Sequence, residues 1–232
     1  LVGSEMFIRD SLDMVSRGLL WAVWMLEVDG SPSSGFEAPL ASQLQARRIL
    51  AGDYSKKRIA IVDEGGHVSW DHSIKDIHDL HVLPNENILF QTSWTQLLEM
   101  RPGGEIVWSY DASTMNGNQG KRVEVHAFQR LENGLTMVAE SGPRRIIEVD
   151  HHGVIHKEIA LKVDHPDPHR DTRMARKLDN GHYLVCHEAD HTVREYDRDG
   201  KVVWEYVTGG EVYGATRLRN GHTLIGNGSG HN

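Results

Sequence analysis

The chain has little cysteine, a deficit of positive charge and no long hydrophobic run. Its 232 residues include one cysteine, Cys186, so no disulfide forms within the chain and a small buried residue is the expected role. Asp and Glu outnumber Lys and Arg by 33 to 25, which argues against nucleic acid as a partner because its binding requires basic faces. The apolar stretch at residues 19–26 is too short to cross a bilayer as a helix, so no membrane span is expected.

Residues 48–232 also lack the 3.6-residue apolar spacing of an amphipathic helix, which excludes a helical solenoid. What they contain instead is a repeated turn. An Asn-Gly-like dipeptide recurs every 40 to 48 residues, and a second series of glycines recurs every 38 to 49. The two series are Asn85, Asn133, Asn180 and Asn220, and Gly66, Gly104, Gly153 and Gly200. Periods of this length are typical of β-propeller blades.

The repeat at residues 172–206 shows the internal pattern most clearly. Short runs rich in Val, Leu, Tyr and Trp alternate with turns at 179–181 and 198–200, where Asn-Gly and Asp-Gly supply the positive φ of tight hairpins. Each repeat is therefore predicted to be a four-stranded antiparallel meander. Because a lone meander cannot bury both of its faces, the meanders must stack around an axis. A tryptophan that recurs once per repeat, as at Trp70, Trp108 and Trp204, is expected to pack between blades.

The predicted fold class is thus an all-β propeller of four-stranded antiparallel blades, with about four blades in residues 48–232. The first repeat lacks a recognisable first strand and the last repeat stops after two, which favours a piece of a parent with six to eight blades. The alternative is a closed four-blade ring in which residues 212–218 supply the missing strand. A truncated ring would expose bare sheet edges, so edge-to-edge self-association is expected for it.

Residues 194–205, Arg-Glu-Tyr-Asp-Arg-Asp-Gly-Lys-Val-Val-Trp-Glu, and the preceding residues 178–184, Leu-Asp-Asn-Gly-His-Tyr-Leu, carry a family resemblance. They resemble the repeat of the quinoprotein-like (PQQ-like) propeller superfamily, and especially of its arylsulfotransferase-like members. The resemblance covers about residues 48–228 and implies the fold. It does not imply one activity, since the superfamily contains dehydrogenases, sulfotransferases and assembly scaffolds. No residue matches a quinone-binding site, so a quinone cofactor is not predicted.

Residues 1–47 are interpreted as a segment outside the repeats. The opening ten residues resemble translated adaptor sequence at the ends of metagenomic genes. Residues 19–26 have the length of the apolar region of a signal peptide, although Glu27 and Asp29 follow directly. The segment therefore indicates a periplasmic or secreted protein, with a cytoplasmic protein as the alternative.

A polar pair stands nine and seven residues ahead of each repeated asparagine. The pairs are Asp76 with His78, Glu124 with His126, Asp171 with Arg173, and Glu211 with Tyr213. Residues two apart on a strand share a face, and the first strand of a propeller blade lies nearest the axis. We therefore expect the pairs to line one mouth of a central channel. Polar second-strand ends and the insertion at residues 160–169 are expected to border the same mouth.

The predicted function is a ligand-binding propeller whose ligand is a small polar or anionic molecule. The predicted ligand-binding residues are Asp76, His78, Glu124, His126, Glu140, His165, His169, Asp171, Arg173, His187, Glu211 and Tyr213. The histidines and Arg173 would hold anionic or hydroxyl groups, and the acids would orient them or take a cation. The insertion at 164–171, with two histidines and three carboxylates, suggests a divalent metal.

Three alternatives remain open for these residues. An enzyme similar to arylsulfotransferases would use His126 or His169 as nucleophile or general acid, with Arg173 stabilising the sulfuryl oxygens. An interaction scaffold would use the rim or top of the propeller instead. A polar plug would pair the acids and bases with one another and hold the blades together.

Overall fold

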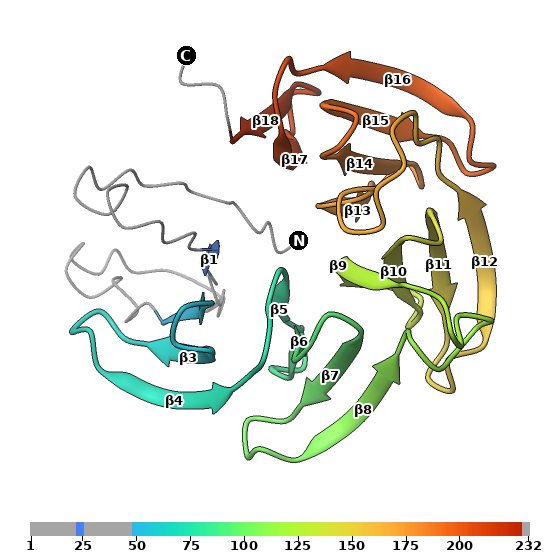
Figure 1. Cartoon of the computed structure of the whole chain (residues 1–232). Coiled ribbons are helices and arrows are strands. Elements are labelled where there is room, and N and C mark those ends of the chain that lie inside the picture. Colours follow the sequence, from blue (N-terminus) through green and yellow to red (C-terminus); the bar gives the residue numbers. More distant parts are fainter. Residues whose placement is uncertain (1–21, 26–47, 229–232) are drawn as a thin grey trace, which may run out of the picture.

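The computed structural model describes residues 22–25 and 48–228, which form five antiparallel sheets and no helix. Four sheets are four-stranded meanders and the fifth has two strands. The sheets are arranged around a common centre, as the all-β propeller prediction requires (Figure 1). No helix in these residues is long and apolar enough to cross a membrane.

The strands follow one another in chain order within each sheet. The first sheet contains β1 (Ala22–Met25), β2 (Ile49–Asp53), β3 (Arg58–Val62) and β4 (Val68–Ser73). The second contains β5 (Leu80–Val82), β6 (Ile88–Gln91), β7 (Gln96–Met100) and β8 (Ile106–Asp111). The third contains β9 (Glu124–Arg130), β10 (Thr136–Ser141), β11 (Arg145–Val149) and β12 (Ile155–Ala160). The fourth contains β13 (Ala175–Lys177), β14 (Tyr183–His187), β15 (Thr192–Tyr196) and β16 (Val202–Val207), and the fifth β17 (Val212–Arg217) and β18 (Thr223–Asn227).

The position of a strand in its sheet sets its distance from the centre. In Figure 1, β5, β9, β13 and β17 lie toward the centre, and β4, β8, β12 and β16 form the outer rim. The segments that carry the predicted polar pairs therefore come together at the centre of the molecule, because they lie at or just before the four inner strands.

The first sheet differs from the sequence-based expectation. Strand β1 pairs antiparallel with β2, with Ala22 opposite Gly52 and Met25 opposite Ile49. The expectation that this sheet lacks its first strand is therefore wrong, and residues 22–25 belong with the first repeat. The apolar run that contains them resembles a signal peptide, but its valine and tryptophan suit a strand equally well. The adaptor-like opening lies outside the described residues.

The alternative of a closed four-blade ring is also wrong, because it required residues 212–218 to supply the missing strand of the first sheet. Residues 212–217 form β17, which pairs with β18 rather than with β2. Among the described strands, β18 has β17 as its sole hydrogen-bonded neighbour, so one of its edges carries no strand there. Edge-to-edge self-association stays a prediction.

Apolar side chains hold neighbouring sheets together. The described residues contain four hydrophobic clusters, and each of them joins two sheets that follow one another in the chain. Representative pairs are Ile59 with Phe90, Leu97 with Phe128, Met137 with Tyr183, and Leu184 with Val212. The indole N–H of Trp108 donates to the carbonyl of His151 in the next sheet at 3.0 Å, as expected for a residue that packs between blades. Cys186 is buried, as predicted.

The repeated asparagines occupy equivalent hairpin turns between first and second strands. In the third sheet the backbone N–H of Gly134 donates to Leu131 at 3.0 Å, and Asn133 Oδ1 accepts from the N–H of Leu135 at 3.1 Å. Gly134 has a φ of +84°, the left-handed conformation that an L side chain disfavours. In the second sheet the same position is Glu86, with a φ of +65°. Glu86 therefore carries a local strain that the third, fourth and fifth sheets avoid by using glycine.

The two turns predict opposite effects of exchanging glycine and a larger residue. Glu86→Gly relieves the left-handed strain and is expected to stabilise the protein by about 0.5–1 kcal/mol. Gly134→Ala is expected to destabilise it by about 1 kcal/mol, and the cost is conformational because an added Cβ meets no atom within 4 Å. Chemical denaturation of both variants measures the two effects. Shifts of the same sign in both variants would contradict the assignment of the turns.

Candidate functional site

Three imidazole rings and an indole gather beside the inner strands. His78 lies in the segment before β5, Trp94 between β6 and β7, His126 in β9, and His169 in the insertion between β12 and β13. The ring centroids of His78 and His126 are 4.7 Å apart, and those of His126 and His169 are 5.3 Å apart. The Trp94 ring lies 4.8 to 5.6 Å from all three. We call His78, His126 and His169 with Glu124 the histidine cluster.

A buried glutamine next to the histidine cluster links the second and third sheets. The side chain of Gln91, at the end of β6, accepts from the backbone N–H of His78 at 3.0 Å. Its amide N–H donates to the carbonyl of Val125 at 2.7 Å, and the N–H of Val125 donates to the carbonyl of Trp94. These bonds fix the backbone on either side of Val125, so Glu124 and His126 project from β9 on the same face.

The protonation of His126 follows from its partners. Its Nδ1 atom lies 2.6 Å from the carbonyl oxygen of Thr172, and since a carbonyl only accepts, Nδ1 carries a hydrogen. Its Nε2 atom lies 3.3 Å from Oε2 of Glu124. The His126 side chain is 1% exposed, so water does not mediate freely between these two atoms. The contact between His126 Nε2 and the Glu124 carboxylate therefore determines the chemistry of this part of the site.

His169 takes the other side of the same carboxylate oxygen. Its Nδ1 atom lies 2.6 Å from Glu124 Oε2, and its Nε2 atom lies 3.3 Å from Nη2 of Arg173. A guanidinium only donates, so Nε2 accepts and Nδ1–H donates to Glu124. This is a neutral imidazole held between a carboxylate and a guanidinium. The side chain is 35% exposed, which places it at the surface of the cluster.

The charges of Glu124 and His78 are set by this environment. Burial alone would raise the pKa of Glu124, but hydrogen bonds from His126 and His169 outweigh it and lower the pKa to about 2. Burial, followed by the charges of His126 and Arg173, lowers the pKa of His78 to about 3. Glu124 is thus ionised and His78 neutral at physiological pH. The Nε2 atom of His78 is buried and has no hydrogen-bond partner among the described residues.

Arg173 connects the cluster to the fifth sheet. Its Nε atom forms an ion pair with Glu188, directly after β14, and its guanidinium carbon lies 5.8 Å from the ring centre of Tyr213 in β17. The Tyr213 hydroxyl donates to Glu211 at 2.6 Å, and this hydrogen bond, together with burial, raises the pKa of Tyr213 to about 12. Glu211 also lies 3.8 Å from Arg170.

Five of the predicted site residues therefore come together: His78, Glu124, His126, His169 and Arg173. Tyr213 and Glu211 lie beside Arg173. The first polar pair is split, because Asp76 forms an ion pair with Lys57 at 3.2 Å while His78 joins the cluster.

Glu140 and Asp171 make bonds within the fold. Glu140 is fully buried, where its carboxylate accepts from Nε of Arg145 at 2.6 Å and from Asn118 at 3.0 Å. The Asp171 carboxylate accepts the backbone N–H groups of Asp167 at 2.7 Å and Gly142 at 3.1 Å. Both side chains fix the two long insertions onto the sheets.

His187, the last residue of β14, is also fully buried. Its Nδ1–H donates to the carbonyl of Asp171 at 2.7 Å, and the hydroxyl of Tyr196 donates to its Nε2 at 2.8 Å. Both ring nitrogens are therefore engaged by the protein. The structure places His187 in the fourth sheet as a packing residue with satisfied hydrogen bonds rather than beside the histidine cluster.

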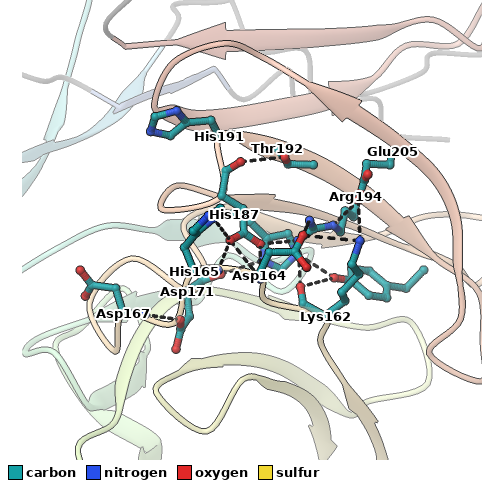
Figure 2. Close-up of polar contacts among 12 residues, drawn as sticks. Lys162, Asp164, His165, Asp167, Asp171, His187, His191, Thr192, Arg194 and Glu205 are labelled. Carbon is teal, nitrogen blue, oxygen red and sulfur yellow. Dashed lines mark hydrogen bonds and ion pairs between the residues drawn. The ribbon is translucent and has the colours of Figure 1, made fainter.

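The insertion at residues 160–169 is anchored by a buried arginine. Arg194 in β15 is 2% exposed, and Figure 2 shows Asp164 and Glu205 converging on it. It forms ion pairs with both of these and with Asp190, and it donates to the carbonyl of Lys162 at 2.9 Å.

Asp190 in turn fixes the start of the histidine-rich part of the insertion. Its carboxylate accepts the backbone N–H of Asp164 at 3.0 Å and that of His165 at 2.7 Å. The ring of His165 is exposed. Of the ligands expected at 164–171, His169 alone belongs to a group of metal-binding geometry in the described residues.

The comparisons with known proteins bear on the fold. Neither a protein-family model nor a curated protein matches the chain. A protein of unknown function from Bacteroides caccae is similar, with a TM-score of 0.67, 22% identity, and coverage of 78% of this chain and 65% of that one. Virginiamycin B lyase from Staphylococcus aureus is similar, with a TM-score of 0.58, 12% identity, and coverage of 77% and 59%. BamB from Moraxella catarrhalis has a TM-score of 0.52, 14% identity, and coverage of 79% and 54%.

These similarities show the fold. The chain is an all-β propeller, and the resemblance of its repeats to the PQQ-like superfamily stays a prediction. The chain spans 54 to 65% of the lengths of the three solved structures. The finer resemblance to arylsulfotransferase-like members stays a prediction.

Several residues of the site were not predicted from the sequence. Trp94, Gln91 and Glu188 do not belong to the register of polar pairs. Trp94 and Gln91 contact His78 of the cluster, and Glu188 forms an ion pair with Arg173 beside it. Glu188 directly follows His187, the polar end of β14, and this position could have indicated a site residue. No comparable pattern marks Trp94 or Gln91.

The buried His187 predicts a pH dependence of stability. Burial and the charge of Arg194 lower its pKa from 6.5 to about 4, so the unfolded chain binds more protons between these values. Its contribution is complete above about pH 6.5 and is lost as the pH falls toward 4. We expect His187→Gln to reduce the loss of stability between pH 7 and pH 5 by roughly 2 kcal/mol.

Denaturation midpoints at the two pH values measure this effect, and the exposed His152 provides the control variant His152→Gln. Groups that titrate alike in all three proteins contribute equally and cancel in the comparison with the native chain. An unchanged pH dependence in His187→Gln would show that His187 is not held neutral in the folded protein.

Proposed function

We propose that the chain is a ligand-binding propeller and that a small anionic molecule binds at the histidine cluster. The observation that carries the proposal is the convergence of three histidines and Arg173 from separate segments, where the buried Nε2 of His78 has no partner among residues 22–25 and 48–228. A buried polar atom of this kind is completed by a ligand or by water. The half-buried His169 and Trp94 give such a ligand access to the cluster.

Each member has a defined role in this proposal. Arg173 provides the positive charge, and its planar N–H groups suit a carboxylate, sulfate or phosphate. The neutral His78 completes a hydrogen bond with its free nitrogen. Trp94 and Tyr213 provide flat apolar faces at the rim of the site. Glu124 holds the His126 and His169 rings in place through its contacts with both of them.

The polar-plug alternative explains part of the same geometry. Glu124 with His126 and Arg173 with Glu188 are acid–base pairs that tie neighbouring segments together. A plug, however, gains stability from satisfying every buried polar group, whereas His78 Nε2 has no partner in the part of the chain that the structure describes. This difference favours binding over a purely structural role.

Binding predicts a response to anions that depends on Arg173. We expect sulfate, phosphate or an organic carboxylate to raise the melting temperature of the native chain, because a ligand that binds the folded state stabilises it. Arg173→Gln should weaken binding about 10–100-fold, the value of one charge-assisted contact. The matched control is Arg219→Gln, which removes an exposed arginine from the turn between β17 and β18. Equal responses from the three proteins, or none in the native chain, would count against the proposal.

A second candidate function is sulfuryl transfer, favoured by the contacts of His169. Its Nδ1–H donates to Glu124 and its Nε2 lone pair lies beside Arg173, so a neutral nucleophile is backed by a carboxylate and faces a cation. His169 Nε2 would take the sulfuryl group from an aryl sulfate, release the phenolate and pass the group to an acceptor phenol. Turnover of an aryl sulfate with a phenol acceptor tests it. We expect His169→Gln to abolish turnover, and absence of turnover in the native chain would exclude this candidate.

A further inference from the structure

Three potential metal ligands converge within the histidine cluster. In the part of the chain that the structure describes, one ligand atom each from Glu124, His126 and His169 lies within 4.8 Å of the other two. Glu124 and His126 come from the start of β9, and His169 comes from the insertion before β13. Two imidazoles and one carboxylate form a set that suits divalent transition metals and leaves coordination positions open.

The contact between Glu124 and His126 requires a positive charge. Because Nδ1 of His126 donates to Thr172, a neutral His126 presents a lone pair at Nε2. That lone pair and Oε2 of Glu124, both acceptors, lie 3.3 Å apart in a buried position. Either a proton or a metal ion must lie between them. An Nδ1–H bond to a backbone carbonyl is also the bond that commonly orients metal-binding histidines.

The separation of two of the ligand atoms fits a small ion. Two ligands of a tetrahedral metal with bonds of about 2.0–2.1 Å lie roughly 3.3 Å apart, which is the separation of Glu124 Oε2 and His126 Nε2. His169 Nδ1 is closer to Glu124, at 2.6 Å, because it donates a hydrogen bond there. Its partly exposed ring can withdraw by the small distance that an ion requires.

We propose that Glu124 Oε2, His126 Nε2 and His169 Nδ1 hold one divalent transition-metal ion, of which zinc is the best match in ligand type, with its open position toward Arg173. The proposal concerns the same site as the proposed function, but it does not require an anionic ligand.

The ion also changes the role of Arg173. When Nδ1 of His169 binds a metal, the hydrogen of the neutral ring moves to Nε2, which now donates. Arg173 Nη2 loses its acceptor at 3.3 Å and is released toward an anion. The anion then contacts both the open position of the metal and the guanidinium. We therefore expect zinc to tighten anion binding, because the two charges act on the same ligand.

Metal uptake by the full chain tests the proposal. Protein freed of metal with a chelator and then dialysed is titrated with Zn²⁺ by calorimetry, and with Co²⁺ to record its visible absorption. We expect one ion per chain. Glu124→Gln and His169→Gln, which keep the size of the side chains, should each weaken uptake at least tenfold and alter the Co²⁺ spectrum.

The control is His182→Gln. His182 Nδ1 lies 2.7 Å from Glu195, so the native chain has a second imidazole–carboxylate pair that is not part of the three-ligand group. The control should keep native uptake. Denaturation midpoints in chelator show whether each variant is folded, and a variant that is unfolded is replaced by Glu124→Asp. Lack of stoichiometric uptake by the native chain, or uptake that both site variants retain, would overturn the proposal.

The anion titration, run in chelator and again in Zn²⁺, separates this proposal from the preceding one. Anion binding in chelator without metal uptake leaves the proposed function intact and refutes the metal site. Metal uptake without any anion response supports the metal site and refutes the anionic ligand. A proton between Glu124 and His126, in place of a metal, corresponds to the first of these results.

Discussion

The packing of each sheet against its neighbours is the interaction on which the rest of the molecule depends. A four-stranded meander has two apolar faces and can cover neither by itself. Each of the four hydrophobic clusters in the described residues therefore spans two consecutive sheets. Their apolar side chains come mainly from the strands, and this leaves the strand ends and the insertions free to carry polar groups. The inner ends of several sheets are brought close together as a result, and the candidate site is built from them.

The polar groups near the centre fall into two kinds. Arg194, Glu140 and His187 are buried with their hydrogen-bonding capacity filled by the protein, and they fix insertions and strand ends in place. The histidine cluster is different, because the contact between Glu124 and His126 requires a proton or an ion, and the buried Nε2 of His78 has no hydrogen-bond partner among the described residues. Buried groups of this second kind are costly for stability unless something else completes them. This difference separates binding residues from structural ones among side chains of the same type.

The repeat period and the turn residues predicted the fold well, since positive-φ glycines and period-2 strands leave a direct mark on the sequence. They also predicted His78, Glu124, His126, His169 and Arg173 as neighbours. Strand β1 escaped prediction because the 23 residues that separate Met25 from Ile49 break the period. Glu140 and His187 stood in the expected register but are paired inside the fold. Register places a side chain near the centre of the molecule, but the partner that it meets there depends on insertions with no repeat of their own.

The buried Arg194 has a mechanical consequence for the cluster. It ties the beginning of the insertion to the fourth sheet, whereas Glu124 and His126 extend from the third. His169 lies at the far end of the same insertion, and just after it Asp171 accepts the N–H of Gly142, which follows β10 of the third sheet. The insertion thus bridges the seam between the two sheets. A ligand or ion held by both Glu124 and His169 would add a further tie across that seam.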